Sequence, residues 1–371
     1  MNVRFKGAIF HRSRRLKLFA FGMLGFRSNI GTLTENMFKR INAFLLVALL
    51  AVALPGFSQV LDPGEPIRID TRLVSVPVVV ADRNARYVSD LTVADFSIIQ
   101  DGDQQAIEFF AAVQEPLTIA LLIDTSLSTE PVLGDIKDSA RSLIKLLSPH
   151  DRAMIVAFDY DIHILSELTS DHEQLRTAVK NASIPDFVGT RLRDATFRTI
   201  ARSFANVRGR KAVIILTDGK DVDSRISRDD LIHSLQESDT LIYTVMFKTG
   251  FGRQLSIRER HFDRYWRIRD GRSVRFPGHD DARRQRAARM NERAIRFLQE
   301  MSEHTGGRFY ATDDGKLKRA FVSIIEELRL QYRLGFYPSD NVDTEALHSI
   351  KVKVARPDVV VRSRTNYRIQ R

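Results

Sequence analysis

Short apolar runs and amphipathic segments alternate through the middle of the chain. The amphipathic segments carry apolar residues three or four positions apart, and the runs between them are almost continuously apolar. Apolar strands that alternate with amphipathic helices are typical of a parallel sheet covered on both faces. The pattern therefore predicts an α/β fold, a Rossmann-like, doubly wound and mainly parallel sheet, over residues 117–332. The expected strands are residues 117–123, 153–158, 212–216, 241–247 and 309–311, and the expected helices are residues 136–147, 172–182, 192–204, 231–236, 291–302 and 317–330.

The segments on either side of this domain are typical of β-strands. Residues 68–81 first alternate between apolar and polar positions and then become a β-branched run. A turn at Asp101-Gly102 separates two of the expected strands before it. We expect residues 333–371 to pack with residues 65–115 into one β-sandwich that flanks the α/β domain. The expected strands are residues 68–81, 96–100 and 106–111 before the domain, and residues 332–337, 350–354 and 359–361 after it.

Positive charge is concentrated at the beginning of the chain. Residues 1–40 hold nine Lys and Arg side chains against Glu35 alone, and the formal net charge of the whole chain is +11. The basic character is therefore mostly a property of residues 1–58, and we expect no nucleic-acid partner. The chain contains no cysteine, which excludes disulfides and thiolate metal ligands.

Residues 37–58 have the pattern of a signal peptide. Lys39-Arg40 precedes an apolar run over residues 41–54, and small residues follow at Gly56 and Ser58. The run is shorter than the roughly 20 residues of a membrane-spanning helix. We predict a secreted, periplasmic or cell-envelope protein. Two questions stay open: whether translation starts at Met1 or Met37, and whether an uncleaved leader anchors the protein in a membrane.

An arginine-rich segment interrupts the α/β pattern at residues 251–289. It holds twelve arginines against five carboxylates, and we interpret it as an inserted loop or a partly helical excursion. One hypothesis is a solvated excursion. The other is a docking patch for an acidic partner, an anionic glycan or a membrane phosphate, with Tyr265 and Trp266 as aromatic anchors.

Oxygen-bearing side chains stand where the expected strands end. Asp124 ends the first core strand and is followed by Ser126 and Ser128, while Asp218 follows a later core strand. Between them, Thr190 precedes a helix. Ligands of open α/β sheets collect beyond the carboxyl ends of the strands. Two carboxylates and three hydroxyls suit a hard cation such as Mg²⁺.

Structural roles for the same residue types stay open. Ser and Asp after a strand also serve as helix caps and turn formers, so a site that binds no metal is an alternative. We expect a turn role for Asp159 and a favourable helix-dipole contact for Asp194. Asp221 and Asp223 are expected in a solvated loop.

The ordered motifs resemble a known metal site. Asp124-x-Ser126-x-Ser128, then Thr190, then Asp218-Gly219 resembles the metal-ion-dependent adhesion site of von Willebrand factor type A (VWA) domains, and the resemblance covers about residues 117–332. The wider layout is similar to the VWA-related family described from acidobacteria. The residues that carry this second resemblance are Leu91-Thr92-x-x-Asp95-Phe96, Asp101-Gly102, Pro116-Leu117, Thr305-Gly306-Gly307-Arg308 and Tyr332-Arg333-Leu334-Gly335-Phe336-Tyr337.

The resemblance implies a role for each residue. Ser126 and Ser128 would bind Mg²⁺, or Mn²⁺ or Ca²⁺, directly, and Thr190 directly or through one water. Asp124 and Asp218 would act largely through water. An open coordination position would accept an Asp or Glu carboxylate of a partner protein. The family usually has Gly where this chain has Leu127, which would either crowd the loop or extend the binding surface.

These observations favour a non-enzymatic protein-binding module. One alternative is a structural scaffold of the cell envelope with a degenerate metal site. Another is a metal-dependent phosphohydrolase, which would need a nucleophile with a positioned acid or base. Ser126 has no evident His partner, and the chain contains no His-Glu-x-x-His, phosphate-binding loop or Gly-x-Ser-x-Gly motif.

Overall fold

The computed structural model describes residues 73–112, 115–185, 187–247, 279–312, 317–339, 342–343 and 345–369. The predicted leader and most of the arginine-rich segment, including Tyr265 and Trp266, lie outside these residues. Within them, no helix is both long enough and apolar enough to cross a membrane.

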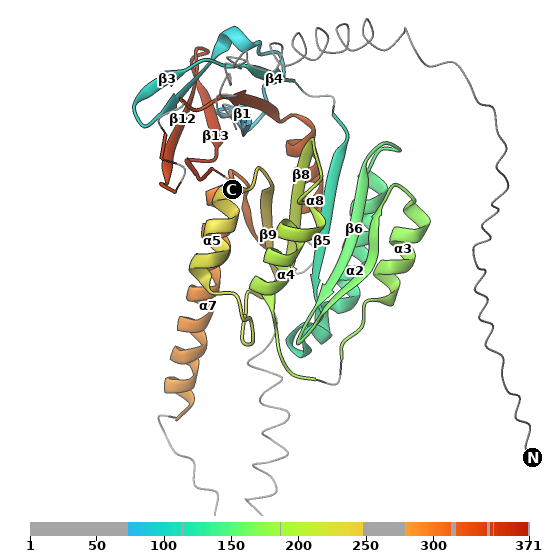
Figure 1. The fold of residues 1–371 in the computed structure, drawn as a ribbon. Coiled ribbons are helices and arrows are strands. Elements are labelled where there is room, and N and C mark those ends of the chain that lie inside the picture. The colour runs from blue at the N-terminus through green and yellow to red at the C-terminus, as the bar shows by residue number, and fades with distance from the viewer. Residues whose placement is uncertain are drawn as a thin grey trace, which may run out of the picture. The chain divides into compact units, whose positions relative to one another are not determined.

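A six-stranded sheet forms the centre of the α/β domain, with strand order β10-β9-β8-β5-β6-β7 (Figure 1). Neighbouring strands are parallel except β7, which returns antiparallel along β6. The predicted mainly parallel sheet is therefore confirmed. The strands are β5 (Leu117–Asp124), β6 (Arg152–Phe158), β7 (Ile162–Thr169), β8 (Arg210–Thr217), β9 (Leu241–Phe247) and β10 (Phe309–Thr312).

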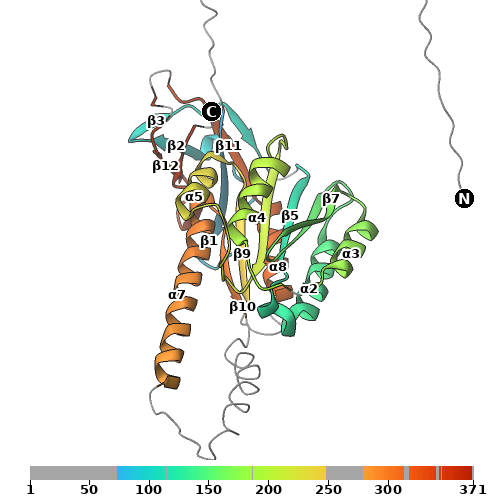
Figure 2. The ribbon, with the colours of Figure 1, turned by 60° about the horizontal axis from the view of Figure 1, so that its bottom comes forward.

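Helices cover both faces of this sheet (Figures 1 and 2). One layer contains α2 (Leu133–Leu146), α3 (His172–Asn181) and α8 (Leu317–Arg329). The other contains α4 (Leu192–Arg198) with its π-helical continuation η3 (Thr199–Ser203), α5 (Arg228–Glu237) and α7 (His279–Thr305).

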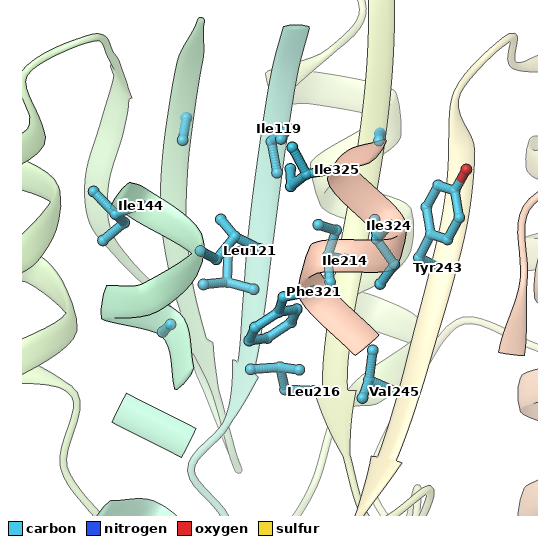
Figure 3. Packing of buried hydrophobic residues seen from close by; sticks show 14 of the residues in the cluster. Ile119, Leu121, Ile144, Ile214, Leu216, Tyr243, Val245, Phe321, Ile324 and Ile325 are labelled. Atoms are coloured by element: carbon cyan, nitrogen blue, oxygen red, sulfur yellow. The ribbon is translucent and has the colours of Figure 1, made fainter. Parts of the chain in front are cut away.

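The side chains of the central strands alternate between the two layers. In β5, Ile119 and Leu121 pack toward the layer with α8, whereas Ala120 and Leu122 pack toward the opposite layer. Figure 3 shows the residues of α8 lying over β5, β8 and β9. Burial on both faces explains why these strands are continuous apolar runs rather than alternating ones.

Strands from both ends of the described chain form a second, antiparallel lobe. The first sheet has the order β13-β1-β11-β4 and the second β14-β12-β2-β3. Each sheet combines strands from before and after the α/β domain, as the predicted β-sandwich required. The strands are β1 (Val74–Asp82), β2 (Phe96–Gln100), β3 (Asp103–Gln105), β4 (Phe109–Ala111), β11 (Tyr332–Phe336), β12 (His348–Val354), β13 (Val359–Ser363) and β14 (Asn366–Tyr367), and a 3₁₀ turn η1 (Val93–Asp95) precedes β2.

Two predicted elements have the wrong bounds. The strand expected at residues 106–111 is shorter, because only β4 (Phe109–Ala111) forms there and pairs with β11, while an unpredicted strand, β3 (Asp103–Gln105), forms a hairpin with β2 in the other sheet. The chain changes sheets between them. Helix α7 begins at His279 instead of Asn291, since residues 285–293 are exposed on all sides and carry no apolar face that could mark the helix.

Candidate metal site

The predicted metal residues lie along the carboxyl edge of the parallel sheet. Asp124 is the last residue of β5, and Asp218 follows β8, the neighbouring parallel strand. Ser126 and Ser128 lie at the start of η2 (Leu127–Val132), which leads into α2. Thr190 stands two residues before α4. Parallel strands end at the same edge, which brings these segments together.

The Asp124 loop turns its two serine hydroxyls toward each other. The Oγ atoms of Ser126 and Ser128 are 3.1 Å apart. Asp124 Oδ1 accepts a hydrogen bond from the Ser126 amide at 3.0 Å, which bends the loop back on its own strand. The Thr129 hydroxyl lies 3.0 Å from the Asp124 carbonyl and 2.8 Å from the Ser126 carbonyl, and braces the same turn.

Thr217 links Asp124 to the strand that carries Asp218. Its hydroxyl donates to Asp124 Oδ2 at 2.7 Å and accepts the Gly219 amide at 2.9 Å. Thr217 was not among the residues predicted for the site. The sequence does contain a signal for it, because Thr217 places a hydroxyl at the end of an apolar strand. This position is fully buried in the structure.

Asp218 is held by the residues that follow it. Its Oδ1 accepts the Lys220 amide at 3.1 Å, and its Oδ2 lies 2.5 Å from Lys220 Nζ. Gly219 has a φ of +80°, and a Cβ there would lie 2.9 Å from the Cβ of Ala294 in α7. Glycine is therefore required both by the backbone conformation and by the close packing of α7.

Thr190 is tied to two neighbouring loops through its backbone. Its carbonyl accepts the amides of Val222 and Asp223, at 3.1 and 3.2 Å. The next amide, Arg191 N–H, donates to the Asp159 carbonyl at 2.8 Å. The segment of Thr190 is thus fixed between the end of β6 and the loop that follows Asp218.

Burial and charge in this group suit a cation. All five side chains are buried. Burial, and then the charge of nearby Asp218, raise the pKa of Asp124 to about 7. Asp124 takes part in no ion pair among the described residues. The carboxylates of Asp124 and Asp218 and the hydroxyls of Ser126, Ser128 and Thr190 offer only oxygen donors, which is the type that hard divalent cations prefer.

The five candidate residues include three hydroxyls, so they differ from metal sites that consist only of carboxylate and imidazole ligands. In the part of the chain that the structure describes, no three His, Asp or Glu side chains gather as a metal-binding group. Leu127, between the two serines, is 37% exposed. The two expected effects of this residue, a crowded loop and an extended binding surface, both stay predictions.

Two acidic neighbours, Asp159 and Asp194, have structural roles. Asp159 is buried and accepts the Thr125 hydroxyl and the Asp161 amide, each at 2.9 Å, so it holds the predicted turn and also braces the Asp124 loop. Asp194 accepts the amides of Arg225 and Ile226 and thereby fixes the loop before α5.

Asp221 was predicted in a solvated loop, and this is wrong. Its side chain is largely buried and accepts the Arg193 amide at 3.0 Å, with the Arg193 guanidinium 3.2 Å away. Burial nevertheless raises the pKa of Asp221. The loop after Asp218 is therefore anchored to the first turn of α4.

The chain is similar to several solved structures at low sequence identity. One is an aerotolerance-related membrane protein from Bacteroides fragilis, at 20% identity, covering 57% of this chain and 98% of that one with a TM-score of 0.40. The vWF domain of the type V pili tip protein Mfa5 from Porphyromonas gingivalis is 13% identical, covering 58% and 95%, with a TM-score of 0.40. Proximal thread matrix protein 1 from the mussel byssus, with a zinc-occupied MIDAS motif, is 14% identical, covering 62% and 49%, with a TM-score of 0.42.

The comparison with curated protein sequences gave no match. A family model does match: that of the von Willebrand factor type A domain, over residues 118–261. The matched segment begins in β5 and contains Asp124, the two serines, Thr190 and Asp218. The closer resemblance to the family described from acidobacteria stays a prediction. On the matched segment and the topology of the sheet, the chain carries a von Willebrand factor type A domain.

Proposed function

We propose that this VWA domain binds a protein partner through a divalent cation, Mg²⁺ or alternatively Mn²⁺ or Ca²⁺, held at the carboxyl edge of the sheet. The observation that carries the proposal is the pair of serine hydroxyls 3.1 Å apart beside the buried carboxylates of Asp124 and Asp218. A cation there would compensate the buried carboxylate of Asp124, which has no ion-pair partner among the described residues, whereas Asp218 is paired with Lys220.

Each residue has a distinct part in the proposed site. Ser126 and Ser128 would hold the cation directly through their hydroxyls, and Thr190 directly or through water. Asp124 and Asp218 would act mainly through water, since Asp124 already accepts bonds from Ser126 and Thr217. Neutral direct ligands leave the cation electrophilic, so a carboxylate from the partner would be bound strongly.

The contacts of the hydroxyls support binding more than catalysis. A nucleophilic serine needs a base within hydrogen-bond reach. The Ser126 hydroxyl instead faces the Ser128 hydroxyl, and the His163 imidazole lies 3.3 Å from Asp159. We therefore do not propose a hydrolase.

A cation titration followed by thermal unfolding tests the site. Ligand at 100 times its dissociation constant stabilises the folded state by about 2.7 kcal/mol. We expect Mg²⁺ or Mn²⁺ to raise the melting temperature, and Asp124→Ala to abolish the rise. Asp103→Ala, at an exposed position of the sandwich, is the matched control and keeps it. An equal response of the wild type and the Asp124→Ala variant contradicts the proposal.

Partner capture tests the binding function itself. The immobilised chain would be incubated with envelope extract in Mg²⁺ or in chelator. A partner retained only in Mg²⁺, and not by Asp124→Ala, supports a cation bridge. A partner retained equally under all three conditions supports the scaffold alternative instead.

We also propose that residues 37–58 direct the chain out of the cytoplasm. The basic pair, the apolar run and the small residues that follow it support this proposal. Mass spectrometry of the protein from fractionated cells distinguishes the outcomes. An N-terminus shortly after residue 58 in the periplasm or medium supports cleavage, and an intact leader in the membrane fraction supports an anchor.

A further inference from the structure

Large apolar side chains are exposed on the four loops around the candidate metal site. They are between 37% and 72% exposed, and they make up five of the thirteen exposed large hydrophobic residues in the described part of the chain. We call this set the apolar collar. It consists of Leu127, Tyr160, Phe187, Val188 and Val222.

The collar residues are joined to the metal-site residues by short connections. Leu127 stands between Ser126 and Ser128, and Val188 is two residues before Thr190. The Val222 amide donates to the Thr190 carbonyl at 3.1 Å. The collar therefore borders the candidate cation position from both the Asp124 loop and the Thr190 segment.

Tyr160 closes the collar on the β6 side. A Cβ on Gly189 would lie 2.8 Å from Cδ2 of Tyr160 and 2.6 Å from Oδ2 of Asp223, so three loops meet at this glycine. The Arg191 guanidinium stacks 4.5 Å from the centre of the Tyr160 ring. These contacts fix the loops, and a fixed apolar surface loses little conformational entropy when a partner binds.

The charges on these loops restrict the partner. Among their described residues, acidic side chains outnumber basic ones by seven to three. A strongly acidic segment would be repelled by this excess of negative charge, which favours a single carboxylate in apolar surroundings. The acidic residues are Asp124, Glu130, Asp159, Asp161, Asp218, Asp221 and Asp223, and the basic ones are Arg191, Lys220 and Arg225.

We infer that the apolar collar is the docking surface for a partner segment in which one Asp or Glu is flanked by large apolar side chains. The inference rests on the proposed cation bridge. The carboxylate would reach the cation while its apolar neighbours cover Phe187, Val188 and Val222. Exclusion of water by these contacts would strengthen the bond between the cation and the carboxylate.

Two displayed peptide libraries test the inference. Both have random flanking residues, one with a fixed central Asp and the other with a fixed central Asn, and each is selected on the chain in Mg²⁺ and in chelator. We expect retention of the Asp library in Mg²⁺ alone, with aromatic and aliphatic residues enriched beside the Asp.

Variants then locate the contact. The triple variant Phe187→Ser, Val188→Ser, Val222→Ser should bind a selected peptide at least about tenfold weaker, which is the effect of losing about 1.4 kcal/mol. Its stabilisation by Mg²⁺ should stay unchanged. The matched control replaces three exposed apolar residues of the sandwich, Val93, Tyr337 and Val360, by Ser and should bind normally.

The outcomes separate the two proposals. A preference for Asp with polar or charged flanks, or normal binding by the collar variant, overturns the collar and leaves the cation bridge in place. Equal selection from the Asp and Asn libraries, with no effect of chelator, overturns the cation bridge and the collar inference with it.

Discussion

Two fully buried carboxylates in this protein have opposite surroundings. Glu327 of α8 accepts the hydroxyl of Tyr243 at 2.6 Å and that of Tyr87 at 3.2 Å. It also pairs with the guanidinium of Arg362 and lies 3.9 Å from that of Arg308. Tyr87 and Arg362 belong to the β-sandwich, so Glu327 joins the two lobes.

Asp124, at the carboxyl edge of the sheet, is surrounded differently. Its carboxylate accepts one amide and one hydroxyl hydrogen bond, and the nearby charge of Asp218 has the same sign. A buried carboxylate compensated by arginines serves the fold. One that is compensated only by neutral donors leaves a favourable place for a cation from solution. The comparison distinguishes a structural charge from a binding charge.

Removal of the Glu327 charge should have the largest effect. Glu327→Gln leaves Arg362 without its partner, and we expect a loss of about 3 kcal/mol in the free energy of unfolding. Urea unfolding followed by circular dichroism measures it. Glu326→Gln, one residue earlier and exposed, should cost little. Equal stability of the Glu327→Gln and Glu326→Gln variants would contradict the structural role of the Glu327 charge.

Asp124→Asn should reduce cation binding without the loss of stability that is expected for Glu327→Gln. Without divalent cations we expect stability equal to or above that of the wild type, because the substitution removes repulsion from Asp218. Cation affinity should fall on the order of 100-fold. Calorimetric titration measures the cation affinity, and unfolding in chelator measures the stability without divalent cations. A large loss of stability in chelator, similar to that of Glu327→Gln, would show that Asp124 is a structural charge.

Thr217→Val tests whether Thr217 supports cation binding by orienting the carboxylate of Asp124. Loss of the 2.7 Å hydrogen bond leaves the carboxylate less well oriented, and we expect cation affinity to fall about tenfold. Thr244→Val, on the adjacent strand β9, removes a buried hydroxyl that donates to the Leu298 carbonyl. It should lower stability without changing cation affinity, and a similar affinity loss in both variants would refute the assigned role.

The smallest effect is expected at Asp101, a carboxylate compensated at the surface. Partial burial acts to raise its pKa, but hydrogen bonds from Ser349 and His348 hold it at about 2. Because the folded pKa lies below 3.8, the ordinary value of an aspartate, this contribution is present above about pH 4 and is lost as the pH falls toward 2.

Asp101→Asn should therefore reduce the acid-induced fall in stability between pH 4 and pH 2. The side chain is 45% exposed, so the difference at neutral pH should stay below about 1 kcal/mol. Asparagine tolerates the positive φ of +48° at this turn. Thermal unfolding across this pH range measures the effect, and an unchanged acid profile would contradict it.

The sequence by itself determined the layered α/β architecture and its flanking strands. Strands buried on both faces are apolar throughout, whereas sandwich strands such as β2 and β12 alternate between more and less buried positions, and this difference is visible in the sequence. It also determined which oxygen-bearing residues follow β5 and β8. Adjacent parallel strands bring such residues to one edge, whatever the loops between them contain.

Only the tertiary structure decided how each charge is compensated. The hydroxyl of Thr217 reaches Asp124 from 93 positions away, and Tyr87 reaches Glu327 from 240. Partners so distant in the chain leave no periodic signal, because hydrogen bonds and ion pairs depend on distances that exist only after the sheet and its helices have packed.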